Sequence, residues 1–80
     1  MKFRKKPVVI EAVQWKGDNL KEAQLFCPDI IQLFDTHLSI FTKEGVMTCD
    51  LNDWIIRGVV GEFYPCKPDI FEQTYDPVYE

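Results

Sequence analysis

The stretch DWIIRGVVGEFYPCKPDIFEQTY, residues 53–75, decides the fold of this 80-residue chain. It predicts two strands, at 54–57 and 62–65, on either side of a turn that two glycines bracket. No helix follows these glycines to direct its N-terminus at an anion, so a turn is favoured over a phosphate-binding loop. Pro68 then suits the first position of a helical turn. Residues 73–78 are expected to form a last strand.

Upstream of this stretch, residues 3–15 carry apolar side chains at both parities. This pattern predicts a first strand that is central, or covered on one side by a helix. The segment 19–27 is the one convincing helix, because Asn19 and Glu22 have the spacing of a capping box and Pro28 ends it. Two turns are too short to be stable alone, so the apolar stripe must pack on a sheet. The stripe consists of Leu20, Ala23, Phe26 and Cys27.

The middle of the chain alternates between apolar and polar residues over short runs. Strands are therefore expected at 30–34, 38–42 and 46–51, with turns at 35–37, 43–45 and 52–53. Together these elements predict an α+β fold, in which one short helix (about 19–27) packs on a small, mostly antiparallel sheet of five to six strands. The length indicates a single compact domain over residues 1–80.

Charge limits the partners that the chain can take. The formal net charge is −4, which disfavours duplex nucleic acid, because that partner requires a clustered basic surface. The charges are segregated, however, and the simplest expectation is that the two ends lie side by side and neutralise each other. A basic arm for nucleic acid is the alternative. The basic start contains Lys2, Arg4, Lys5 and Lys6, and the acidic end contains Asp69, Glu72, Asp76 and Glu80.

Other features of the sequence indicate a cytoplasmic protein. The apolar run after the basic start is too short for a signal peptide, and no stretch is long enough to span a membrane. The three cysteines lack framework spacing and are expected to be reduced thiols in the cytosol. So short a chain buries little of its surface, so homodimerisation is a reasonable way to bury more.

The residues that catalysis or metal binding would require are sparse. The single histidine, His37, and the three cysteines do not supply four metal ligands at close spacing, so we expect no metal and no cofactor. Cys66 precedes Lys67, whose charge could lower the pKa of the thiol and make it reactive, although an inert, partly buried thiol is favoured. We therefore expect a non-enzyme, with a small thiol-based enzyme as the alternative.

The best candidate for a binding site lies in the stretch quoted above. Aromatic rings can stack on or anchor a ligand, and an arginine offers a planar fork to phosphate or carboxylate. The alternative interpretation is that the aromatic residues belong to the core and the cations pair with nearby acids. The candidate set is Trp54, Arg57, Glu62, Tyr64, Lys67 and Asp69.

Both ends of the chain resemble small proteins of tailed phages and prophages of the PGDYG type. The resemblance lies in MKFRKKPVVIEAVQW at the start and in DWIIRGVVGEFYPCKPDIFEQTY near the end, about half of the chain. The sequence departs from the pattern at Leu51-Asn52, where such proteins often have Pro-Gly. The resemblance implies a phage or prophage origin and a location in the host cytoplasm. It implies no activity and no functional residues.

These observations favour an accessory protein that binds a host protein without catalysis. One alternative is a counter-defence protein that sequesters a small anionic ligand, such as a nucleotide signal. It would use Trp54 and Tyr64 for the base and Arg57 and Lys67 for phosphate. Another alternative is a minor component of the virion or of its assembly.

Overall fold

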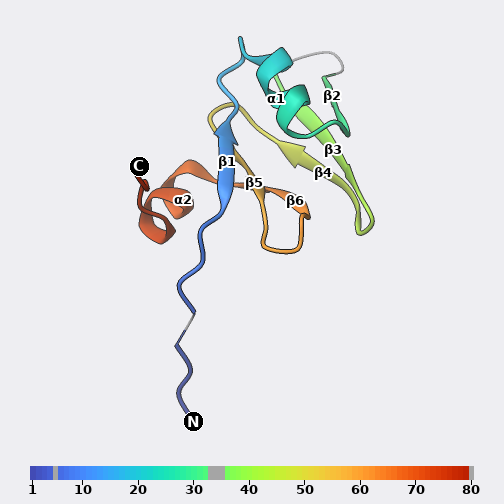
Figure 1. Cartoon of the computed structure of the whole chain (residues 1–80). Helices are drawn as coiled ribbons and strands as arrows, with labels where there is room; N and C mark the ends of the chain where they lie inside the picture. The colour runs from blue at the N-terminus through green and yellow to red at the C-terminus, as the bar shows by residue number, and fades with distance from the viewer. Residues whose placement is uncertain (5, 33–35, 80) are drawn as a thin grey trace.

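The computed structural model describes residues 1–4, 6–32 and 36–79. Figure 1 shows the order of the elements along the chain. They are β1 (Glu11–Gln14), α1 (Leu20–Phe26), β2 (Ile30–Gln32), β3 (Leu38–Thr42), β4 (Gly45–Cys49), β5 (Trp54–Arg57), β6 (Phe63–Cys66) and α2 (Pro68–Thr74).

The strands form two antiparallel sheets of three strands each. One sheet has the order β1-β5-β6 and the other has the order β2-β3-β4. The prediction of an α+β fold with mostly antiparallel strands is therefore confirmed. The structure adds the division of the strands between two sheets and a second short helix. No helix in the described ranges is long and apolar enough to cross a membrane.

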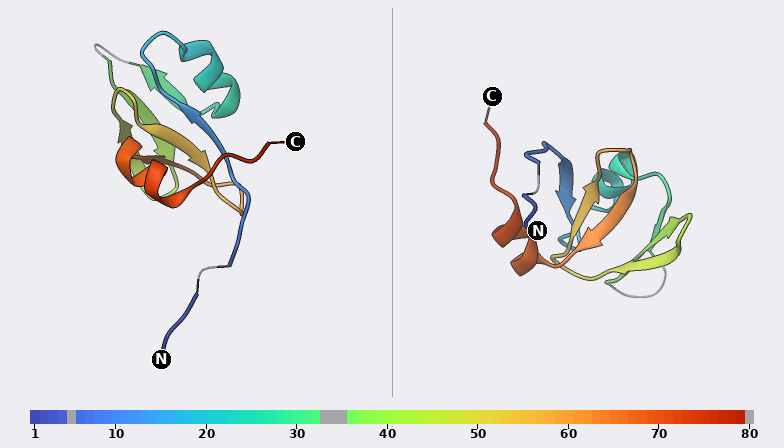
Figure 2. Two further views of the ribbon diagram at one scale, coloured as in Figure 1. Left: turned by 90° about the vertical axis from the view of Figure 1, so that its left-hand side faces the viewer. Right: turned by 90° about the horizontal axis from the view of Figure 1, so that it is seen from below.

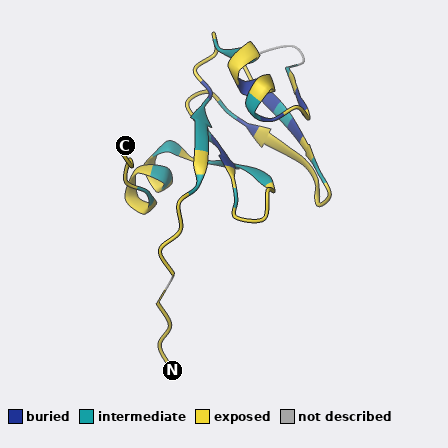
Figure 3. Cartoon of the chain, in the orientation of Figure 1, coloured by how far each residue is buried: buried dark blue, intermediate teal, exposed yellow. Residues whose placement is uncertain are grey.

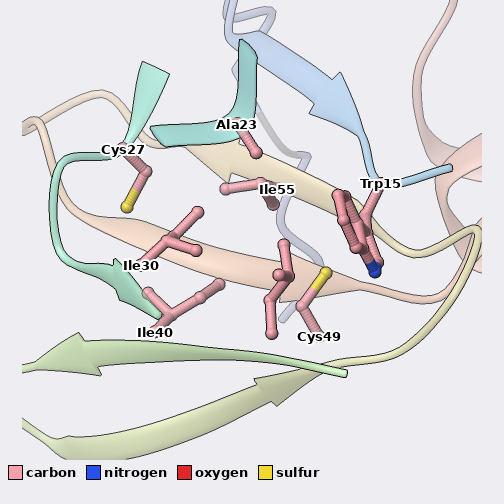
Figure 4. Close-up of a cluster of buried hydrophobic side chains, with 8 residues drawn as sticks. Trp15, Ala23, Cys27, Ile30, Ile40, Cys49 and Ile55 are labelled. Atoms are coloured by element: carbon pink, nitrogen blue, oxygen red, sulfur yellow. The ribbon is translucent and has the colours of Figure 1, made fainter. Parts of the chain in front are cut away.

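The core lies between α1 and the two sheets (Figure 4). As expected, α1 directs its stripe inward: Ala23 and Cys27 are fully buried, and Phe26 meets Phe63 of β6 edge-to-face at 5.5 Å. The two turns of α1 thus pack against both sheets. The main cluster of buried residues is Trp15, Ala23, Cys27, Ile30, Leu38, Ile40, Cys49 and Ile55.

Strand β5 is buried on both of its faces. Successive side chains of a strand point to opposite faces, yet Ile55 and Ile56 are 0% and 1% exposed. Ile55 belongs to the main core, while Ile56 shares a face with Trp54. The Trp54 ring stacks on Phe71 of α2, with centroids 4.2 Å apart and an interplanar angle of 8°. Hence α2 covers the face of β5 that is turned away from the main core.

The start of α1 differs in detail from the expected capping box. Asn19 is the N-cap residue, but its side chain makes no cap hydrogen bond. Instead, the Asn19 amide accepts a hydrogen bond from the backbone N–H of Lys16 and donates to the backbone oxygen of Gln14. It also donates to Glu22 Oε1 at 2.7 Å. The side chain therefore ties the helix start to the end of β1, because that turn offers nearer partners than the helix does.

The end of the chain is helical where a strand was expected. Pro68 starts α2 as predicted, but the helix runs on to Thr74, and no strand forms over 75–79. The expected strand at 73–78 is therefore wrong. In the helix, Phe71 and Tyr75 lie on one face, with ring centroids 5.0 Å apart. The packing of Phe71 against Trp54 favours the helix over a strand that would contain Pro77.

The expected first strand, 3–15, forms only over Glu11–Gln14. The pairing stops where Glu11 meets Arg57, because β5 ends there and offers no further partner. The N-terminal arm, residues 1–9, is exposed wherever it is described and runs away from the body of the protein (Figures 1, 2 and 3). The two ends of the chain do not pair as strands. The expected neutralisation of the basic start by the acidic end therefore does not occur through strand pairing.

The remaining predictions follow the sequence closely. Strands β3 and β5 have the expected bounds, β4 and β6 shift by one or two residues, and β2 begins at Ile30 as expected. Gly45 has a φ of +123° in the expected hairpin turn. Residues 33–34 of the strand expected at 30–34, and residue 35 of the turn expected at 35–37, lie outside the described residues.

We predict that Phe71→Ala lowers the free energy of unfolding by about 2 kcal/mol, because it removes the stack that holds α2 on β5. Gln73→Ala is the matched control, since Gln73 is exposed on the same helix. We expect it to change stability by less than about 0.5 kcal/mol. Urea unfolding curves followed by circular dichroism would measure both. Equal losses for the two variants would contradict the assigned role of the stack.

Candidate functional site

The structure distributes the six predicted site residues over three places. Trp54 lies beneath α2 against Phe71, and Asp69 is exposed in the first turn of α2. Lys67 precedes α2 and contacts two aspartates. The other three residues, Arg57, Glu62 and Tyr64, lie near the turn between β5 and β6.

Lys67 belongs to a junction around the side chain of Asp53. Asp53 is only 2% exposed. Asp53 Oδ2 accepts hydrogen bonds from Lys67 Nζ at 3.0 Å and from the backbone N–H of Asp50 at 2.9 Å. Lys67 Nζ also donates to Asp50 Oδ2 at 2.7 Å. The backbone oxygen of Asp53 accepts from the N–H of Trp15 at 2.9 Å. The junction thus joins the end of β1, the turn before β5 and the start of α2.

Asp50 and Lys67 favour each other's ionised forms. Hydrogen bonds from Lys67 lower the pKa of Asp50 below its ordinary 3.8. Hydrogen bonds to Asp50 and Asp53 raise the pKa of Lys67 above its ordinary 10.5. The contribution of Asp50 to stability is thus complete above pH 3.8 and is lost as the pH falls through its lowered pKa. The contribution of Lys67 is complete below pH 10.5 and is lost as the pH rises through its raised pKa.

His37 extends the same cluster at the surface. Its Nδ1 lies 2.6 Å from Asp50 Oδ1, which leaves the second oxygen of that carboxylate for Lys67. Even so, in the part of the chain that the structure describes, no group of three or more His, Cys, Asp or Glu side chains could hold a metal ion. The contacts of His37 and Lys67 with Asp50 join the segment before β3 to the start of α2.

The turn between β5 and β6 places two apolar side chains in solvent. Val59 is 69% exposed and Val60 is 81% exposed. The turn is closed by the N–H of Gly58, which donates to the backbone oxygen of Glu62 at 2.7 Å. Gly61 takes a φ of +85°, and a Cβ on Gly58 would collide with the Glu62 carboxylate. The positive φ of Gly61 favours glycine at that position, whereas at Gly58 the flexible Glu62 side chain could move aside for a Cβ.

Two adjoining hollows flank this turn. The larger has a volume of about 450 Å³ and lies between the root of the N-terminal arm, the turn and the end of α2. Glu62, Tyr64, Thr74 and Tyr75 line it. The smaller has a volume of about 260 Å³ and contains Arg57. We call Arg57, Val59, Val60, Glu62 and Tyr64 the turn surface.

The charged and polar groups of the turn surface are accessible. Arg57 Nη1 lies 3.9 Å from Glu11 Oε1, and both side chains are more than half exposed, so this ion pair is weak and leaves the arginine available. Burial, together with a hydrogen bond to Tyr75, raises the pKa of Tyr64 to about 12. Tyr64 is therefore a neutral phenol at physiological pH.

The thiols show no sign of activation. Burial raises the pKa of Cys66, and the charges of Asp53 and Asp69 raise it further. This shift is opposite to the one that activation by Lys67 would require. Burial also raises the pKa of Cys27, and it raises that of Cys49 to about 12. All three are free cysteines.

Sequence reasoning missed Asp50, Asp53 and Tyr75. The predicted turn at 52–53 was the one available signal for Asp53, because an aspartate beside a turn often accepts a backbone hydrogen bond. Its burial depends on Lys67, fourteen residues away along the chain. Tyr75 was placed in the expected last strand, so its contact with Tyr64 could not be foreseen.

Comparison with known proteins adds no family. Searches against protein-family models, curated proteins and solved structures found no match for this chain. The site is therefore interpreted from its own geometry.

We predict that Asp53→Ala lowers the free energy of unfolding by about 2–3 kcal/mol, because it removes a buried, charged acceptor of two hydrogen bonds. Asp18→Ala, at an exposed position in a turn, is the control and is expected to change stability by less than about 0.5 kcal/mol. Thermal and urea unfolding would provide both values. An Asp53 variant as stable as the control would contradict the junction.

We also predict that iodoacetamide alkylates Cys66 more slowly than a free cysteine at pH 8, because the raised pKa leaves less thiolate. Cys27 and Cys49 are fully buried and should react only after unfolding. Peptide mass spectrometry over time would give the three rates, with the urea-unfolded protein as the control. Rapid alkylation of Cys66 in the folded protein would restore the hypothesis of a thiol enzyme.

Proposed function

We propose that this chain is a small, non-catalytic binding module of phage or prophage origin, and that it binds a host protein through the turn surface. The observation that carries the proposal is the pair of exposed valines, Val59 and Val60, at the tip of a closed turn. Arg57 and Glu62 flank them with one charge of each sign. An apolar centre with a polar rim is the arrangement of protein interfaces.

Two features argue against the alternative of a nucleotide-sequestering protein. A nucleotide would need Lys67 for its phosphates, but two aspartates already hold that ammonium group. It would also need Trp54 for its base, but that ring is stacked on Phe71. The charged residues that line the open hollows beside the turn are two cations, Lys6 and Arg57, and two acids, Glu11 and Glu62. This balance of charge suits a protein surface better than an anion.

The remaining parts of the proposal have separate support. The raised pKa of the Cys66 thiol and the absence of a neighbouring base among its described contacts support a role without catalysis. The three free thiols support a reducing compartment such as the host cytoplasm. The phage origin is supported by the resemblance of the two ends of the sequence to phage proteins.

We predict that Val60→Asp weakens binding of the host protein at least about tenfold, which corresponds to 1.4 kcal/mol, because it places a charge at the centre of the contact. The control is Leu25→Asp, since Leu25 is 77% exposed on α1, away from the turn. Affinity capture from host lysate with the wild type and both variants would identify the partner, and calorimetry with the purified partner would give the dissociation constants.

Three results would contradict the proposal: no host protein captured by the wild type, equal binding by the wild type and Val60→Asp, or loss of binding only in Leu25→Asp. A circular dichroism spectrum of each variant would establish that it is folded before its binding is compared.

A further inference from the structure

The N-terminal arm combines positive charge with exposed apolar groups. Phe3 is 88% exposed and Val9 is 75% exposed. Lys2, Arg4 and Lys6 lie among them, and none of the three forms an ion pair with a described carboxylate. An arm of this composition exposes apolar surface to water, and its cations have no described carboxylate as a partner. It therefore has the properties of one half of an interface.

The outward face of α2 has the opposite charge. Phe71 and Tyr75 turn inward, which leaves Asp69, Ile70 and Glu72 in solvent. Asp76 follows just after the helix and is also exposed. Ile70 is 53% exposed, so this acidic face contains an apolar group as well. No described cation forms an ion pair with these carboxylates.

We propose that the N-terminal arm of one copy of this chain docks on the acidic face of α2 of a second copy, so that two chains form an arm-exchanged dimer. Lys2 and Arg4 then face Glu72 and Asp76 of the other copy, and Phe3 covers its Ile70. The same contact forms twice around a two-fold axis, which closes the assembly at two chains.

The geometry favours the second copy over the chain's own helix. The root of the arm, at Lys6 to Val8, lines the larger hollow together with Thr74 and Tyr75 at the end of α2. From there the arm continues away from the helix (Figures 1 and 2). To reach its own α2 the arm would have to reverse its direction, which its described residues do not do.

The lengths are compatible with this exchange. Six extended residues span about 20 Å. The seven residues of α2 span about 10 Å. The arm beyond Pro7 can therefore cover the whole helix of another copy. The net charge of −4 disfavours the nucleic acid considered above as a partner for the arm.

A charge-swap experiment tests the exchange. The arm variant is Lys2→Glu with Arg4→Glu, and the helix variant is Glu72→Lys with Asp76→Lys. Each variant alone presents like charges at both contacts, whereas an equimolar mixture presents opposite charges at both. Sedimentation velocity at low ionic strength would measure the mass of the wild type, of each variant and of the mixture.

We expect the wild type to form a dimer, each variant alone to dimerise at least tenfold more weakly, and the mixture to form a heterodimer. Added salt should weaken the wild-type dimer, because the contacts are exposed. If circular dichroism shows that the helix variant is unfolded, Glu72→Gln with Asp76→Asn replaces it and should also weaken the dimer tenfold.

Three outcomes would overturn the exchange. A wild type that stays monomeric at every soluble concentration leaves no dimer to explain. Variants that dimerise as well as the wild type place the interface elsewhere. Folded variants that stay monomeric when mixed indicate that the arm contacts its own chain.

Discussion

The burial of the Asp53 carboxylate is the constraint on which the rest of the structure depends. A charged oxygen can leave water only where donors replace it, and here the donors come from Asp50 and Lys67. These hydrogen bonds to the Asp53 carboxylate fix the turn between the two sheets and the direction in which α2 begins. The Asp53 backbone also holds Trp15, whose indole N–H donates to the backbone oxygen of Thr36 at 2.6 Å. The carboxylate and the backbone of Asp53 therefore connect the end of β1, the turn before β5 and the start of α2.

The features that the sequence predicted well are local. The stripe of α1, the alternation of β3, the bounds of β5 and the start of α2 at Pro68 all depend on residues a few positions apart. The errors are at the ends, where structure depends on distant partners. The strand expected at 3–15 is longer than the observed one, because the length of β1 is set by its partner β5. Residues 73–78 were expected to form a strand, because the sequence does not reveal that Phe71 stacks on Trp54.

The candidate site shows the same division. Arg57, Glu62 and Tyr64 flank one turn, as their spacing in the sequence indicated, although Arg57 lines one hollow and the other two residues line the other. Lys67 and Trp54 are near them in sequence, but Lys67 is held by two aspartates and Trp54 by a helix. The turn before β5 is instructive too. Asn52 there takes a φ of +73°, a conformation that Asn tolerates better than most residues other than Gly.

The way in which the strands pair also imposes an order on synthesis. The β2-β3-β4 sheet consists of consecutive hairpins, so all its partners are present once residue 49 has left the ribosome. Strand β1 is made first but has no partner until β5 follows. Trp15 likewise lacks its backbone partners until the turn at 50–53 exists. The middle of the nascent chain can therefore pair its strands before the two ends do. Strand β6, the last to be made, completes the sheet to which β1, the first to be made, belongs.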